Sequence, residues 1–329
     1  MKQAVLNLMW MSGAFEALRL LNRSKVLVLT YHRFSEAPYP ERISASALAS
    51  QLDYLRSRYT IVSLSMIERW LHGNATLPAA SAAITIDDGY RDAYEIALPI
   101  FRERNVPATL FAVTDFIDGK SWLWTDAVHF ITARAPARQI SVPVGGGTLE
   151  LALNGRESRA AAAVRINEAL KEQNEATRKE TIERIALECG TRVPDLPPPE
   201  FGPASWDQLR EMEASGIAIG SHTVSHPILT QVDAAQLNDE VTRSRARLEA
   251  MLDHPVTLFC YPNGTHSARV RDAVARVGYR LAVTTEPGLN DGTTDPLALR
   301  RVHTEWDLPH FAQSTSGFEE TKARLRAYI

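Results

Sequence analysis

Two short polar motifs contain residue types that could hydrolyse a bond with the help of a metal ion. Asp87 and Asp88 are adjacent and precede a glycine, and His222 and His226 have three residues between them. One carboxylate and two imidazoles are a common ligand set for a catalytic divalent metal, with positions left for water and substrate. The second carboxylate would be the base that takes a proton from that water.

Both motifs also have purely structural interpretations. Asp-Gly pairs are common in turns, and single histidines are usually capping or core residues. The apolar stretch AAITI at 82–86 argues against a simple turn, because it places the two carboxylates at the end of a buried strand. Gly220 precedes the histidine pair and Pro227 follows it, which favours a tight turn over a long helix.

The elements that must position these residues are short apolar stretches that alternate with amphipathic helical stretches. This alternation favours a mostly parallel sheet. About seven strands separated by helices predict a barrel-like α/β fold. The strands are expected at 25–30, 82–86, 108–113, 217–219, 256–260, 279–283 and 299–302.

Five polar clusters directly follow expected strands, and they contain His32, Asp87 with Asp88, His222 with His226, Tyr261, and His303. The carboxyl ends of parallel barrel strands share one face, where active sites lie. We therefore expect these clusters to lie close together. His303 is the candidate acid for the leaving group, with His32 as the alternative, and either could instead hydrogen-bond to the surrounding structure.

The alternation stops between about 117 and 203, and we interpret this region as an insertion on the barrel. Stretches at 140–144 and 148–153 flank three glycines, 145–147, and predict a hairpin. Helical stretches at 156–170 and 175–188 follow. Trp122 and Trp124 open the region and could stack on a sugar ring, although ordinary packing is the simpler expectation.

The chain of 329 residues has a net charge of −3, which gives no reason to expect a nucleic-acid partner. Cys189 and Cys260 are a poor disulfide framework, so we expect a reducing, cytoplasmic location. Residues 1–24 predict an amphipathic helix that packs on a barrel formed by 25–329. The second interpretation is peripheral membrane contact through 1–22, and no stretch is long and apolar enough to span a bilayer.

Three segments together resemble the polysaccharide deacetylases with a NodB-type domain, carbohydrate esterase family 4. They are TIDDGY at 85–90, GSHTVSHP at 220–227 and the preceding SWDQLREMEASG at 205–216. The start YHRF at 31–34 is typical of one branch of the family. The resemblance covers about 25–116 and 201–305, and it leaves out the insertion.

This resemblance implies a distorted (β/α) barrel that removes N-acetyl, or sometimes O-acetyl, groups from a glycan. By motif position, Asp88, His222 and His226 would bind a divalent metal, often zinc, and Asp87 would be the general base. The metal and the backbone N–H of Tyr261 would stabilise the oxyanion. A histidine would protonate the departing amine.

Two motifs depart from the family pattern. Many members carry an arginine that steadies the base, but the corresponding segment here is FCYPNG at 259–264. Arg300 and Arg301 are the candidates to replace it. The last motif reads LRRVH at 299–303, and the choice of acid between His303 and His32 stays open.

The sequence therefore predicts a metal-dependent deacetylase. It would hydrolyse N-acetyl groups of a polysaccharide or a lipid-linked glycan precursor by metal-activated water. Two alternatives remain at this point: a NodB-type hydrolase of a non-sugar amide, and a catalytically silent glycan-binding module. Intact Asp87, Asp88, His222 and His226 argue against the silent module.

Overall fold

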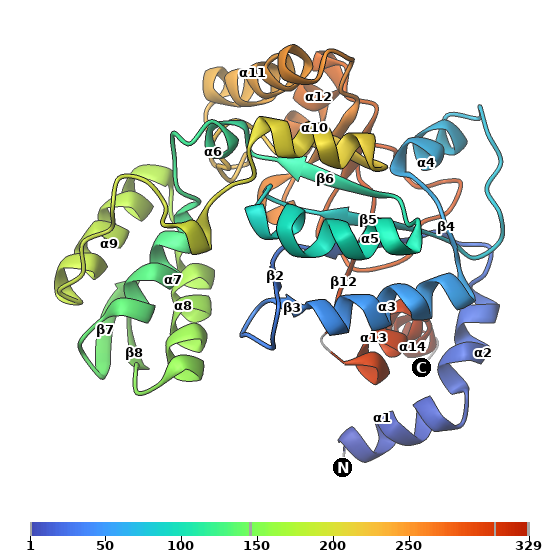
Figure 1. Ribbon diagram of the computed structural model, residues 1–329, viewed down its shortest axis with the longest axis horizontal. Helices are drawn as coiled ribbons and strands as arrows, with labels where there is room; N and C mark the ends of the chain where they lie inside the picture. Colours follow the sequence, from blue (N-terminus) through green and yellow to red (C-terminus); the bar gives the residue numbers. More distant parts are fainter. Residues whose placement is uncertain (1, 145–146, 306, 328–329) are drawn as a thin grey trace.

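The structure, a computed structural model, describes residues 2–144, 147–305 and 307–327. Its centre is a curled parallel sheet with helices packed around it (Figure 1). Seven strands follow one another in the order β11, β10, β9, β6, β5, β1 and β12, and an eighth, β4, pairs with β5. The bounds are β1 (Leu27–Tyr31), β4 (Thr60–Ile61), β5 (Ser81–Ile86), β6 (Ala108–Ala112), β9 (Ile217–Ser221), β10 (Leu258–Cys260), β11 (Leu281–Val283) and β12 (Val302–His303). The predicted distorted barrel of about seven strands is confirmed.

The central strands are buried along their whole length. Every residue of β1 and β5 is buried, as expected for parallel strands covered on both faces. Val283 of β11 forms a parallel bridge with Leu299, and Leu29 of β1 lies opposite Val302. The segment 299–303 therefore lies between the two ends of the strand path and brings its side chains to the carboxyl ends of both β1 and β11.

Helices follow most strands and cover the sheet. They are α3 (Ala45–Arg58), α4 (Leu64–Leu71), α5 (Leu98–Arg104), α6 (Thr114–Ile117), α10 (Trp206–Ala214), α11 (Ala234–Leu252), α12 (Ala268–Val277), α13 (Leu308–Thr315) and α14 (Phe318–Ala327). A π-helical turn, η1 (Ala93–Ala97), precedes α5. The start of α10 follows from its sequence, because Ser205 and Gln208 satisfy each other's backbone N–H groups in a capping box.

The region between α6 and α10 forms a separate lobe beside the barrel (Figure 1). The hairpin of β7 (Gln139–Val144) and β8 (Gly147–Ala152) packs with α7 (Trp124–Arg134), α8 (Arg156–Leu170) and α9 (Glu175–Glu188) around its own apolar core. The predicted hairpin and helices are confirmed, and α7 is an additional helix. Gly145 and Gly146 of the predicted turn lie outside the described residues.

The N-terminal segment forms two helices where one was predicted. They are α1 (Lys2–Met11) and α2 (Ala14–Leu21), and the break between them falls at Gly13, whose φ of 75° leaves the helical region. Among the described residues, the structure contains no single helix long and apolar enough to cross a bilayer. These two helices together meet the length and composition criterion, but they are bent by 69°. Met1 lies outside the described residues.

Candidate active site

The structure brings the polar clusters of the sequence together at the carboxyl ends of the strands. Asp87 follows β5 directly, and His222 follows β9. The order of strands in the sheet places β6 between these two, and β10 lies on the other side of β9. The expectation that the clusters share one face of the barrel therefore holds for both motifs.

Unusual backbone conformations aim these side chains. Asp88 has a φ of 78° and His226 a φ of 61°, both in the left-handed region that non-glycine residues rarely adopt. Such conformations often persist at functional sites, where the surrounding structure enforces them. The turn after β5 separates the two adjacent carboxylates, and the turn after β9 brings the two imidazoles together, with ring centres 4.7 Å apart.

Asp88, His222 and His226 form a group with the geometry of a metal site. Asp88 Oδ1 lies 3.5 Å from Nε2 of His222 and 3.6 Å from Nε2 of His226. Two ligand atoms at tetrahedral angles around a zinc ion are about 3.4 Å apart. The three donor atoms all lie within 4.8 Å of one another, so these residues fit a small divalent cation.

The protonation of the two histidines favours metal binding. Nδ1 of His222 lies 2.8 Å from the carbonyl oxygen of Cys260, which assigns the proton to Nδ1 and leaves Nε2 free as a ligand. Burial lowers the pKa of both imidazoles and keeps them neutral, which is the form that binds a metal. Nδ1 of His226 is buried and has no hydrogen-bond partner among the described residues.

Asp87 is held by a fully buried arginine, Arg301. Its Nη1 and Nη2 lie 2.8 Å from Oδ1 and Oδ2 of Asp87, a bidentate pair. The guanidinium also donates to the hydroxyl of Thr85 and the carbonyl of Thr284. Arg301 therefore takes the place of the arginine that the third motif lacks, and Arg300 is half-exposed beside Glu286.

The two adjacent carboxyls differ in proton affinity. Burial favours the neutral form of Asp87, but the charge and hydrogen bonds of Arg301 outweigh it and hold the pKa of Asp87 well below its ordinary value. Burial, reinforced by repulsion from Asp87, raises the pKa of Asp88 well above its ordinary value. Asp87 is therefore ionised on its own, whereas Asp88 needs a cation to favour its charged form.

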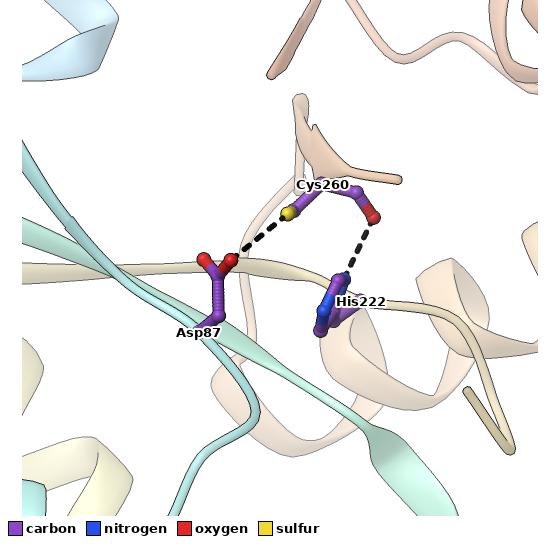
Figure 2. A group of neighbouring side chains, drawn as sticks. All are labelled: Asp87, His222 and Cys260. Atoms are coloured by element: carbon purple, nitrogen blue, oxygen red, sulfur yellow. Dashed lines mark hydrogen bonds between the residues drawn. The ribbon is translucent and has the colours of Figure 1, made fainter. Parts of the chain in front are cut away.

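A second group of possible ligands, Asp87, His222 and Cys260, fits a metal less well (Figure 2). Asp87 already has Arg301 as its counter-ion, and Nδ1 of His222 is bound to a carbonyl oxygen. Burial raises the pKa of the Cys260 thiol well above its ordinary value, which keeps it neutral, whereas metals bind the thiolate. Cys260 is thus a small buried residue beside Asp87.

The two candidate acids differ in their contacts. Nε2 of His32 lies 3.6 Å from Oδ2 of Asp87, and the side chain is 44% exposed. His303 lies opposite Thr30 in the sheet, and its side chain makes no hydrogen bond or ion pair with any described residue. Partial burial lowers the pKa of both imidazoles, and Asp87 opposes that shift in both.

Tyr261 is the residue whose backbone N–H was expected to stabilise the oxyanion. Its backbone N–H donates to the carbonyl oxygen of Val283 at 3.2 Å, and its hydroxyl donates to the carbonyl of Leu297. The N–H that was expected to bind an oxyanion is therefore already engaged in this structure. This bond belongs to the parallel pairing of β10 with β11, in which Cys260 lies opposite Val283.

A cavity of about 590 Å³ opens beside the metal-site residues. His32 and Asp88 from the barrel line one part of it, and His129, Arg156 and Arg159 from the insertion line another. The insertion is therefore a wall of the cavity. This contact could not be predicted from the sequence, because the apolar periodicity of the insertion's helices indicates only how they pack with one another.

Comparison with known proteins assigns the family. The sequence matches the polysaccharide deacetylase family over residues 74–282, more than half of the chain, and the chain belongs to this family. The protein named "Putative polysaccharide deacetylase YxkH" of Bacillus subtilis (strain 168) is 33% identical over 96 residues. That match covers 29% of this chain and spans about a third of YxkH, 34% of its length.

Solved structures of deacetylases share the fold. The Streptococcus pyogenes deacetylase PplD, solved with acetate, matches with a TM-score of 0.61 and 19% identity over 89% of this chain and 98% of PplD. IcaB from Ammonifex degensii matches with a TM-score of 0.55 and 20% identity over 88% of this chain and 97% of IcaB. The polysaccharide deacetylase BC0361 from Bacillus cereus matches with a TM-score of 0.56 and 20% identity over 88% of this chain and 69% of BC0361.

Proposed function

We propose that this chain is a metal-dependent deacetylase that hydrolyses N-acetyl groups of a polysaccharide or of a lipid-linked glycan precursor. Family membership supports a deacetylase acting on a carbohydrate. The observation that carries the proposal is the pairing of Asp87 with Arg301 beside the group of Asp88, His222 and His226. Asp87 is an ionised base, His222 and His226 are neutral imidazoles, and Asp88 would be ionised by a bound metal. Amide hydrolysis by activated water needs this combination of a base and a metal site.

Asp88, His222 and His226 would hold the metal, and zinc suits one carboxylate and two imidazoles in tetrahedral geometry. The metal would polarise the acetyl carbonyl and lower the pKa of water. Asp87 would accept the proton of the attacking water, and Arg301 would keep that carboxylate ionised and oriented. Arg301 is thus proposed as a positioning residue.

The leaving amine needs a proton, and one of two histidines, His32 or His303, is proposed to supply it. His32 lines the cavity and contacts Asp87, which supports it over His303. His303 remains the alternative because its strand ends at the same face of the barrel. The backbone N–H of Tyr261 could assist an oxyanion only after leaving the carbonyl of Val283.

A metal-exchange assay tests this function. The protein is stripped with a chelator and then reloaded with zinc, and acetate release is measured over a panel of N-acetylated and O-acetylated glycans and over non-sugar acetamides. We expect release from an N-acetylated glycan that disappears on stripping and returns with zinc. Release from non-sugar amides alone would favour the alternative hydrolase, and tight glycan binding with no acetate release would favour a silent binding module.

We also propose a cytoplasmic location with peripheral membrane contact through residues 1–22. Five large apolar side chains of α1 and α2 are exposed, a concentration that suits insertion into a lipid interface: Val5, Leu8, Met11, Leu20 and Leu21. The test is membrane fractionation of the full chain and of a variant in which Leu8, Met11 and Leu21 are replaced by serine. Unchanged fractionation of the variant would refute this part of the proposal.

A further inference from the structure

Arg178, in α9, is a buried charge that Glu175 attracts, but the effect of burial on its pKa outweighs that attraction. Its side chain is 3% exposed, and it makes no ion pair or hydrogen bond within the described ranges 2–144, 147–305 and 307–327. Its guanidinium carbon lies 4.7 Å from the centre of the Trp124 ring. A cation–π contact recovers only part of the solvation that burial removes, so the site is incomplete as it stands.

Two other polar groups near Arg178 share this property. Nε1 of Trp124 and Oγ of Ser121 are buried and have no hydrogen-bond partner among the residues that the structure describes. Buried N–H groups nearly always have an acceptor in native proteins. Ser121, Trp124 and Arg178 all line one cavity of about 790 Å³ between the insertion and the barrel. Of these three, Arg178 carries the charge, so its guanidinium is the group that a ligand in the cavity would bind.

The charges around this cavity compensate Arg178 only in part. Glu175 and Glu183 line it, and Lys179 and Arg192 balance them. Glu175 is also engaged by the amide of Gln236. Two carboxylates therefore face three basic side chains, Arg178 included, and the lining keeps one net positive charge, which favours an anion.

The rest of the wall is apolar. Ile182, Leu187 and Val193 line it together with Trp122, and Leu187 is 80% exposed although it is a large aliphatic residue. An apolar surface beside a buried cation suits a ligand that is itself amphiphilic. On the barrel side, the cavity reaches His226, one of the three residues proposed to hold the metal.

We propose that this cavity binds the phosphate of an amphiphilic phosphate ester, with the phosphate at Arg178 and the apolar chain along Ile182 and Leu187. A phosphate group offers a negative charge and acceptor oxygens, which suit the planar guanidinium of Arg178. Because the cavity reaches His226, a sugar carried on that phosphate would be presented to the active site. This last step rests on the proposed function, whereas the binding site itself does not.

Calorimetric titration of decyl phosphate, below its micelle concentration, tests the site in an Asp87→Asn background that is expected to be inactive. We expect decyl phosphate to bind at least about tenfold more tightly than inorganic phosphate, and decyl maltoside not to compete. Arg178→Met should weaken decyl phosphate at least about tenfold, and Arg165→Met, an exposed arginine of α8, should not. Equal affinity for inorganic phosphate, or undiminished affinity of Arg178→Met, would overturn the proposal.

The stability of the ligand-free protein separates a binding role from a structural one. If Arg178 serves only to bind a ligand, its buried charge destabilises the ligand-free fold, because the guanidinium loses hydration without gaining an ion pair. Arg178→Met should then unfold at the same or a higher urea concentration than the parent. A lower midpoint for Arg178→Met than for Arg165→Met would mean that Arg178 holds the fold, which would overturn the proposal. Binding of decyl phosphate by a protein that releases no acetate would keep this site and refute the proposed activity. The reverse result would keep the activity and refute the site.

Discussion

Arg301 donates two hydrogen bonds of 2.8 Å to the two carboxylate oxygens of Asp87, from a segment more than two hundred residues later in the chain. Both side chains are buried, with 0% and 3% of their surfaces exposed. Removal of one partner from a buried charge pair strongly destabilises the folded protein, because the other charge stays buried without compensation. The pair therefore links the last segment of the barrel to the proposed chemistry.

Replacement of Arg301 by methionine should lower kcat/KM by at least about a hundredfold, because Asp87 loses the charge that keeps it ionised. The pKa of Asp87 lies below its ordinary value in the folded protein. The pair therefore stabilises the fold above the ordinary carboxyl pKa, and this contribution disappears as the pH falls through the lowered value. In Arg301→Met the acid limb of the pH profile should move to higher pH.

Arg301→Lys and Arg300→Met are the matched variants for that experiment. The lysine keeps the charge but cannot form the bidentate pair, so its acid limb should lie between those of the parent and of Arg301→Met. Arg300 is 52% exposed and should tolerate methionine with less than about a twofold change in rate. An unchanged pH profile in a folded Arg301→Met protein would contradict the positioning role.

Removal of any proposed metal ligand should weaken zinc binding by at least about a hundredfold. His226→Ala and Asp88→Asn each leave two of the three donors, and zinc content after dialysis should fall well below one ion per chain. Metal analysis by mass spectrometry reads this out without any substrate. His129→Ala, a histidine of the cavity wall that contacts Glu41, is the matched control and should keep its zinc. Full zinc occupancy in His226→Ala would remove that residue from the ligand set.

The general acid can be identified with two single variants. If His32 protonates the leaving amine, His32→Ala should lower kcat about a hundred- to ten-thousandfold and remove the alkaline limb of the pH profile, while His303→Ala keeps both. The contacts of His32 with Asp87 and the cavity lead us to expect this result. The opposite pattern would assign the acid to His303. Substrates with a good leaving group should be less affected by the correct replacement.

Asp118 should stabilise the junction between α6 and the helices α10 and α11. Its carboxylate accepts hydrogen bonds from Trp206, Arg247 and Lys120. Burial opposes the charged form, but these bonds outweigh it and lower the pKa of Asp118 to about 2. The stabilisation is complete above the ordinary pKa of 3.8 and is lost as the pH falls toward 2.

Asp118→Asn should therefore lower the free energy of unfolding at pH 7 by about 1–2 kcal/mol, and by about half as much at pH 3. Urea unfolding at the two pH values measures this difference. Asp207→Asn is the matched control, because its side chain is 90% exposed and, among the residues that the structure describes, pairs only with Arg210 of the same helix. Equal destabilisation by Asp118→Asn at pH 7 and pH 3 would contradict the assignment.

Long apolar stretches and reciprocal caps made much of the fold predictable. The strands β1, β5 and β6 and the helices α8 and α9 lie where their periodicity indicates. The N-terminal region was predicted as one helix because its apolar pattern continues across Gly13, and only the backbone conformation of that glycine breaks it. Strand β4 was not predicted, because two residues are too few to show the alternation of apolar and polar side chains that marks a strand.

The site was predictable where neighbouring residues act together, and it was not where the fold joins distant segments. The motifs identify Asp87, Asp88, His222 and His226 directly. The choice between Arg300 and Arg301 depends on strand register, because a shift of one residue exchanges the inner and outer faces. The burial of Arg178 could not be predicted, because a charged residue beside Ile182 and Ile185 on the inner face of α9 is ordinarily expected at the surface.

Asp87→Asn separates the proposed base from the three proposed metal ligands, because removal of a base alone leaves the metal in place. Zinc content and acetate release are measured on the same zinc-loaded preparation. If Asp87 is the base, the variant keeps one zinc per chain and loses at least about a thousandfold in acetate release. Loss of zinc together with activity would make Asp87 a ligand, and retained acetate release would show that another residue is the base. Either result would overturn the roles proposed for these four residues.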